Sequence, residues 1–215
     1  MVALDLAGHG GSGRGRVRHT VAGLADDVLA VADELDLGRV VLVGHSMGGP
    51  VSLAAAARMP GRAVAVVAVD TLHDVEAPIP REVIDGLVER FESDFEGSLR
   101  AMVSSMVPSG QAAVVDAVVA TALRTDRRAA IELMTDFPAV RPAALLERAG
   151  VPVRSLNAAP DAVSRSPTAV ETNRRHGDFE VVLLDGAGHY PMLEIPEVFE
   201  AELRGVLERL PGAAR

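Results

Sequence analysis

Ser46 is the residue whose surroundings point most directly to chemistry. It lies at the centre of a Gly-x-Ser-x-Gly pattern that runs from Gly44 to Gly48, directly after the apolar run Val40–Val43. A serine on a sharp turn from a strand to a helix is held in a strained backbone conformation, with its hydroxyl lifted clear of the sheet. We therefore predict that Ser46 is a nucleophile, and that Gly44 and Gly48 let strand and helix approach closely.

The residue after the serine has a role in the same chemistry. In a strand-turn-helix segment the Met47 N–H lies at a helix N-terminus, where the helix dipole favours negative charge. A backbone N–H in that place can stabilise the oxyanion that forms during acyl transfer. The pattern thus predicts Met47 as an oxyanion donor. The alternative is that the segment is an ordinary glycine-rich connection between a strand and a helix.

A serine hydroxyl is a poor nucleophile until a base removes its proton. Among six histidines, His189 follows the apolar run Phe179–Leu184 in a glycine-containing loop. In α/β folds with a parallel sheet, ligands bind at the carboxyl ends of the strands. We predict His189 as the general base, whereas His45, adjacent to Ser46 in sequence, is expected to have a packing or hydrogen-bonding role.

The surrounding elements alternate between strands and helices. Short apolar runs bounded by Gly, Pro or Asp are typical of buried parallel strands. Helical spacing of apolar residues lies between them. The predicted strands are Val40–Val43, Ala63–Val69, Val151–Leu156 and Phe179–Leu184, and the predicted helices of this part are Leu24–Leu35, Pro50–Met59 and Glu197–Leu210. This order predicts an α/β fold with a parallel sheet.

The stretch from about Ile79 to about Leu146 interrupts this alternation. It contains helical patterns separated by prolines and no convincing strand. We expect an all-helical insertion. The predicted division is a core of residues 1–75 and 147–215 and a helical subdomain of residues 76–146.

Three segments together resemble the α/β-hydrolase family: Asp5–Ser12, Gly44–Gly49 and Gly188–Glu197. They are similar to the family's segment after its fourth strand, its nucleophile elbow and its catalytic-histidine segment. The resemblance implies a mostly parallel sheet flanked by helices with a helical cap insertion. It also implies Ser46 as nucleophile, His189 as general base and acid, and a carboxylate that orients His189.

Two aspartates compete for the role of that carboxylate. Asp161 follows the strand Val151–Leu156, where most members of the family keep the acid. Asp70 ends the strand Ala63–Val69, and some branches place the acid there. We favour Asp70, because a residue directly on a strand end is held more rigidly than one in a longer loop.

The family normally has three strands before the Asp5 segment, so the resemblance implies an N-terminally truncated chain. Met1–Leu6 must then pair with Val40–Val43, pair elsewhere or remain unpaired. An exposed edge on an apolar strand can pair with a second copy, which predicts a homo-oligomer.

The loop after the third strand supplies another oxyanion N–H in this family, and loss of such a donor lowers the rate about 10²–10³-fold. We therefore expect low activity.

The amino-acid composition excludes several classes of partner and of chemistry. The 215 residues carry a net charge of −9, which argues against a nucleic-acid partner. The chain has no Cys and no Lys, which excludes thiolate nucleophiles, Cys-ligated metals and Schiff-base chemistry.

We expect a cytoplasmic enzyme with no cofactor, no metal and no membrane contact. The predicted function is serine hydrolysis of a carboxylic ester or similar acyl compound, with a C–C bond hydrolase or a non-catalytic small-molecule binder as alternatives.

Overall fold

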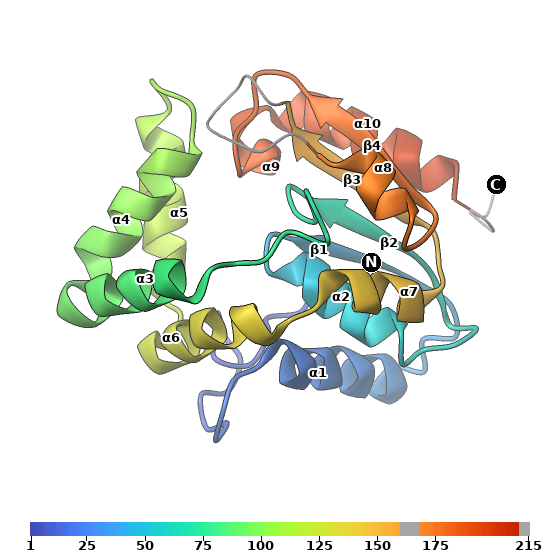
Figure 1. Cartoon of the computed structure of the whole chain (residues 1–215), viewed down its shortest axis with the longest axis horizontal. Coiled ribbons are helices and arrows are strands. Elements are labelled where there is room, and N and C mark those ends of the chain that lie inside the picture. Colours follow the sequence, from blue (N-terminus) through green and yellow to red (C-terminus); the bar gives the residue numbers. More distant parts are fainter. Residues whose placement is uncertain (160–167, 211–215) are drawn as a thin grey trace.

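A parallel sheet of four strands forms the centre of the molecule (Figure 1). The computed structural model describes residues 1–159 and 168–210. The strands lie in the order β1 (Val40–His45), β2 (Ala63–Val69), β3 (Val153–Ala158) and β4 (Phe179–Leu184). β2 and β4 have the predicted bounds. β1 extends two residues beyond its predicted end, and β3 begins and ends two residues later than predicted. The α/β fold with a parallel sheet is confirmed.

Helices cover both faces of this sheet. On one face, α2 (Gly48–Ala56) and α7 (Pro142–Ala149) pack against β2, and α1 (Val21–Glu34) packs on α2. On the other face, α10 (Pro196–Glu208) contributes Phe199 and Val206 to a core with Val67 and Leu156. Two short helices, α8 (Val170–Arg174) and α9 (Pro191–Glu194), precede and follow β4. The alternation of side chains along β2 divides the apolar residues between these two cores.

β1 differs from the expectation of a strand buried on both faces. Most of its residues are only half-buried, and Val43 is 53% exposed. Within the described residues β1 pairs with β2 alone, and residues 1–6 form no strand. Instead, Asp5 accepts a hydrogen bond from the Gly11 N–H. Of the three arrangements left open for Met1–Leu6, the structure has the unpaired one, and a strand with one neighbour leaves part of its surface uncovered.

The predicted helical insertion consists of four helices that stand to one side of the sheet (Figure 1). Their own apolar core contains Phe91, Leu99, Val103 and Val119. The helices are α3 (Arg81–Ser93), α4 (Phe95–Met106), α5 (Ala112–Ala122) and α6 (Arg127–Asp136), followed by the 3₁₀ turn η1 (Phe137–Ala139). The division at residues 76–146 stays a prediction, and α7, which spans its C-terminal boundary, packs against α2.

Polar contacts fix α6 to the segment that leads into α1. Glu132 accepts hydrogen bonds from the His19 backbone N–H at 2.8 Å and from its ring Nδ1 at 2.9 Å. Arg128 donates to the other oxygen of Glu132 at 2.7 Å. Burial raises the pKa of Glu132, but the hydrogen bonds from His19 and Arg128 outweigh burial and lower the pKa to about 2. The charged form of Glu132 therefore helps to hold the helices against the core.

The Glu132 contact predicts a pH-dependent contribution to stability. Because folding lowers this pKa from 4.5 to about 2, the stabilisation is complete above the unfolded value and is lost as the pH falls through the folded one. We expect Glu132→Gln to reduce the urea unfolding midpoint at pH 6 and to have a much smaller effect near pH 2.

The exposed Glu89 of α3 offers a matched control, because no ion pair involves it among residues 1–159 and 168–210. Glu89→Gln should leave the midpoint unchanged at both pH values. Equal losses for Glu132→Gln at both pH values would contradict a role for its charge.

Candidate active site

Ser46 lies in a tight turn between β1 and α2. Its φ angle is +52°, a left-handed conformation that a non-glycine residue adopts at a cost of about 1–3 kcal/mol. Two backbone hydrogen bonds hold the turn: the Ser46 N–H donates to the Val69 carbonyl at 3.0 Å, and the Gly49 N–H donates to the Ser46 carbonyl at 2.9 Å. The strained serine expected from the sequence is present.

Two glycines permit the close approach of strand, helix and loop. A Cβ on Gly44 would lie 2.1 Å from the Gly48 carbonyl oxygen, and a Cβ on Gly49 would lie 2.4 Å from Cγ2 of Thr71. A Cβ on Gly48 would meet no atom within 4 Å. The predicted role of Gly44 is confirmed, but that of Gly48 is wrong, because the close contact at the helix start involves its carbonyl and the neighbouring Gly49.

The structure brings His189 between Ser46 and Asp70. Nε2 of His189 is 2.9 Å from the Ser46 Oγ, and Nδ1 is 2.6 Å from Oδ2 of Asp70. His189 is 6% exposed and Asp70 is 2% exposed. With Asp70 ionised, Nδ1 donates to the carboxylate and Nε2 is left to accept from the serine hydroxyl. This arrangement can move a proton from the serine to the imidazole.

Asp70 extends from the carboxyl end of β2 with a φ of +41°. While Oδ2 faces His189, Oδ1 accepts a hydrogen bond from the Ala158 N–H at the end of β3, at 3.0 Å. A buried carboxylate is tolerated only when such partners replace water. Asp161, the alternative acid, lies outside the described residues.

The loop that carries His189 is held from two sides. The His189 N–H donates to the Met106 carbonyl at the end of α4, at 2.9 Å. Nε2 of His45 lies 2.6 Å from the His189 carbonyl oxygen, and the two rings are 4.6 Å apart. This is the hydrogen-bonding role predicted for His45. Because Tyr190 also packs against the apolar core of α3–α5, the histidine loop and the helical insertion are coupled.

Met47 is the N-cap residue of α2. In the part of the chain that the structure describes, its N–H donates to no other group. An N–H that follows a nucleophile and begins a helix is suited to bind an oxyanion.

A buried polar cluster beside Asp70 was not predicted from the sequence. Ser155 Oγ is 2.6 Å from Oδ1 of Asn157, and both residues are fully buried on β3. The amide nitrogen of Asn157 contacts Oγ1 of Thr168 at 2.9 Å and Nδ1 of His73 at 3.3 Å. The available signal was two polar residues at a spacing of two within an apolar strand, because that spacing places both on one face.

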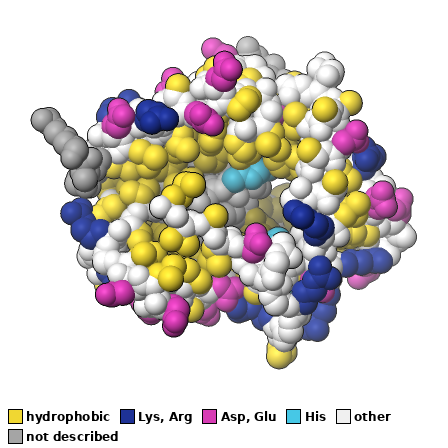
Figure 2. All heavy atoms as spheres, turned by 180° about the vertical axis from the view of Figure 1, so that it is seen from behind, with side chains coloured by type: hydrophobic (Ala, Val, Ile, Leu, Met, Phe, Trp, Pro, Cys, Tyr) yellow, Lys and Arg dark blue, Asp and Glu magenta, His cyan; other side chains and the backbone are white. Residues whose placement is uncertain are grey.

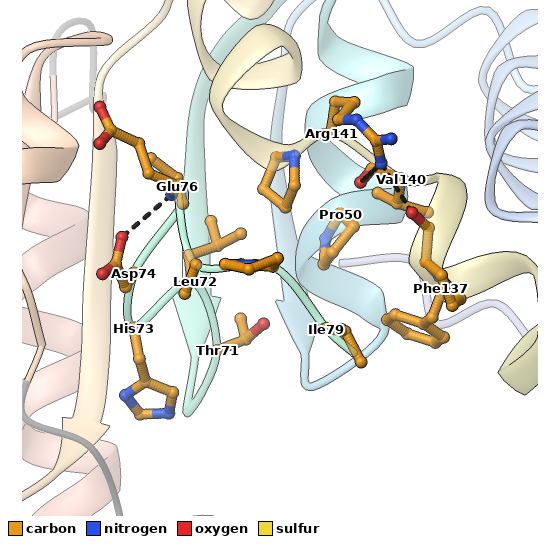
Figure 3. A pocket seen from close by; sticks show the side chains of 15 residues that line it. Pro50, Thr71, Leu72, His73, Asp74, Glu76, Ile79, Phe137, Val140 and Arg141 are labelled. Atoms are coloured by element: carbon orange, nitrogen blue, oxygen red, sulfur yellow. Dashed lines mark hydrogen bonds between the residues drawn. The ribbon is translucent and has the colours of Figure 1, made fainter. Parts of the chain in front are cut away.

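A cleft with a volume of about 730 Å³ lies next to this cluster (Figure 3). Its walls are the segment 71–79, which follows Asp70, and the segment 137–142, which leads into α7, together with Pro50. Ser46 and His189 are not among the residues that line it. The cleft therefore lies where the chain enters and leaves the helical insertion.

Seen from behind the view of Figure 1, the molecule has a hollow with hydrophobic side chains around it and histidine side chains within it (Figure 2). Within residues 1–159 and 168–210, no cluster of three or more His, Asp or Glu side chains is arranged to hold a metal ion. Nor does any helix in these ranges combine the length and apolarity needed to cross a bilayer.

Comparison with known proteins identifies the family and similar folds. The sequence profile of the Alpha/beta hydrolase family matches residues 1–202. A thermophilic esterase from Thermogutta terrifontis has a similar fold, with a TM-score of 0.78 at 23% identity over 95% of this chain and 78% of the esterase. A bromoperoxidase from Bacillus anthracis gives a TM-score of 0.80 at 17% identity over 94% of this chain and 79% of that protein.

Sequence relatives match over shorter segments. A 2-(acetamidomethylene)succinate hydrolase of Mesorhizobium japonicum is 35% identical over 89 residues, which are 41% of this chain and 31% of that enzyme. Across three curated relatives the matched segment spans 17% to 31% of the relative's own length.

The close approach at Gly44 predicts a large effect of a side chain there. Gly44→Ala must displace the Gly48 carbonyl, and overpacking of this kind costs about 1–3 kcal/mol. We expect a lower urea unfolding midpoint. Gly38→Ala is the control, because a Cβ on Gly38 would meet no atom within 4 Å. Equal stabilities of the two variants would contradict the packing at Gly44.

The short contact between His189 and Asp70 predicts a proton resonance far downfield of ordinary amide signals. In ¹H NMR spectra we expect Asp70→Asn to abolish or strongly shift this resonance, because the charged acceptor is lost. Asp161→Asn should leave it in place. The reverse pattern would assign the carboxylate to Asp161.

Proposed function

This chain belongs to the alpha/beta hydrolase family, and from that premise we propose that it is a serine hydrolase acting on a carboxylic ester or similar acyl compound. The contact of His189 with both Ser46 and Asp70 carries the proposal. A hydroxyl, an imidazole and a buried carboxylate in this order form a Ser-His-Asp triad.

In the proposed reaction, the Ser46 Oγ attacks the substrate carbonyl carbon while its proton passes to Nε2 of His189. Asp70 keeps Nδ1–H oriented and stabilises the imidazolium. The imidazolium then protonates the leaving alcohol, and an acyl-enzyme remains on Ser46. Water, deprotonated by His189, then attacks the acyl carbonyl carbon. The carboxylic acid leaves, and His189 returns the proton to Oγ of Ser46.

The Met47 N–H is the proposed oxyanion donor. Its place at the start of α2, without another acceptor among the described residues, supports this role. It is the one such donor that we identify in these residues. Since each donor contributes about 10²–10³-fold to kcat, we propose that turnover is slower than in esterases with two donors.

An ester substrate is supported by several similar proteins. Structures of an esterase and an enol-lactonase resemble this chain, and one sequence relative is a hydrolase. Helices α3–α6 are proposed to act as a cap that shapes the substrate site, because the α4 terminus bonds to the His189 loop. A small-molecule substrate, a cytoplasmic location and a homo-oligomer formed through the β1 edge remain predictions.

The first test is covalent labelling with a fluorophosphonate, read by peptide mass spectrometry. We expect a stoichiometric adduct on Ser46, because the probe reacts with serines that a base activates. Ser46→Ala should give no adduct. Folded wild-type protein without an adduct would contradict the proposal and favour a binding role.

A substrate series then refines the chemistry. We expect p-nitrophenyl acetate to be hydrolysed. Turnover of a vinylogous diketone without turnover of esters would instead indicate a C–C bond hydrolase.

A further inference from the structure

Asp70 has a second imidazole beside it. Oδ2 of Asp70 binds His189, and Nε2 of His73 lies 3.6 Å from Oδ1. His73 follows Asp70 by three residues on the loop that leaves β2, and its side chain is 19% exposed. The loop is strained, since Asp70 and Leu72 have φ angles of +41° and +55°. The backbone thus folds back so that His73 faces the carboxylate of its own strand end.

The hydrogen bonds around Asn157 decide which ring nitrogen of His73 carries the proton. The Thr71 backbone N–H can only donate, and it lies 3.2 Å from Oδ1 of Asn157. This contact identifies Oδ1 as the amide oxygen, and the other side-chain atom as the NH₂ donor. That NH₂ group is 3.3 Å from Nδ1 of His73, so Nδ1 must accept. A neutral His73 therefore carries its proton on Nε2, the nitrogen that faces Asp70.

Two further contacts keep this arrangement in place. The amide of Asn157 also donates to Oγ1 of Thr168 at 2.9 Å, and the His73 carbonyl accepts from the Ala169 N–H at 2.7 Å. Residues 168 and 169 thereby hold the Asn157 amide and the His73 backbone in place. The Ala158 N–H donates a hydrogen bond to Oδ1 of Asp70, the oxygen that also lies 3.6 Å from Nε2 of His73. That distance is too long for a hydrogen bond, so the His73 contact with Oδ1 is electrostatic.

We propose that His73 is a positioning residue, which directs its Nε2–H at Oδ1 of Asp70 in a tautomer that Asn157 selects. The inference rests on the proposed function, because its effect on Ser46 passes through Asp70 and His189. At 3.6 Å from Oδ1, the Nε2–H dipole favours one rotation of the carboxylate about χ2. That rotation sets the direction of the Oδ2 contact with His189, and so the placement of Nε2 for the serine proton.

The tautomer is tested without any substrate. Long-range ¹H–¹⁵N NMR spectra of the full chain at pH 7 distinguish the two neutral forms of each histidine. We expect the Nε2–H form for His73. His19 is the internal control, since its Nδ1 lies 2.9 Å from a carboxylate oxygen of Glu132, which can only accept. We expect His19 in the Nδ1–H form. A Nδ1–H form at His73 would overturn the inference.

A pair of variants tests the effect on the serine. His73→Phe keeps a planar ring but has no N–H, and we expect labelling of Ser46 by the fluorophosphonate to slow about tenfold, or ~1.4 kcal/mol. The side-chain amide of His73→Gln can place an N–H near the position of Nε2, and it should restore much of the rate. Thermal melts of both variants separate this pattern from unfolding.

The outcomes distinguish the inference from the proposed function. Equal labelling rates for His73→Phe and wild type would reject the positioning role. Equal losses in Phe and Gln variants would indicate a purely structural role and would also reject it. If wild-type protein is not labelled at all, the proposed function fails, and the inference fails with it as a statement about catalysis, whatever the tautomer.

Discussion

The carboxyl group of Asp70, buried at the end of β2, is the constraint on which the site depends. A buried carboxyl group needs polar partners, and those that contact Asp70 come from β3, from the loop after β4 and from the loop after Asp70 itself. His189 faces one oxygen, and the Ala158 N–H and His73 face the other. Through these contacts, Asp70 connects the ends of β2 and β3 to the loop after β4. The same contacts give His189 its orientation toward Ser46.

Parallel strand order explains why these residues can meet. All four strands end at one edge of the sheet, so turns that are far apart in sequence lie side by side there. Ser46 and Asp70 both have left-handed backbone conformations at that edge. Strain of this kind persists only where the surroundings over-determine it. Here they do so through the Ser46 N–H bond to Val69 and through the close contacts at Gly44 and Gly49.

The helical insertion is part of the same arrangement. Its α4 terminus accepts the His189 N–H, Tyr190 packs against its apolar core, and Glu132 binds it to the segment before α1. A movement of these helices would therefore change the position of His189. The coupling is physical, because it consists of direct hydrogen bonds and packing between neighbouring elements.

The sequence by itself determined the local parts. Apolar runs located the four described strands, and the pattern of Gly44 and Ser46 predicted the sharp turn. Both signals depend on neighbouring residues only. The tertiary structure decided the rest. It alone shows that Asp70 reaches His189, that Gly49 meets Thr71, that Asn157 and His73 gather beside the carboxylate, and that β1 is exposed along its edge. Each of these depends on the pairing of distant segments, which residue spacing along the chain does not encode.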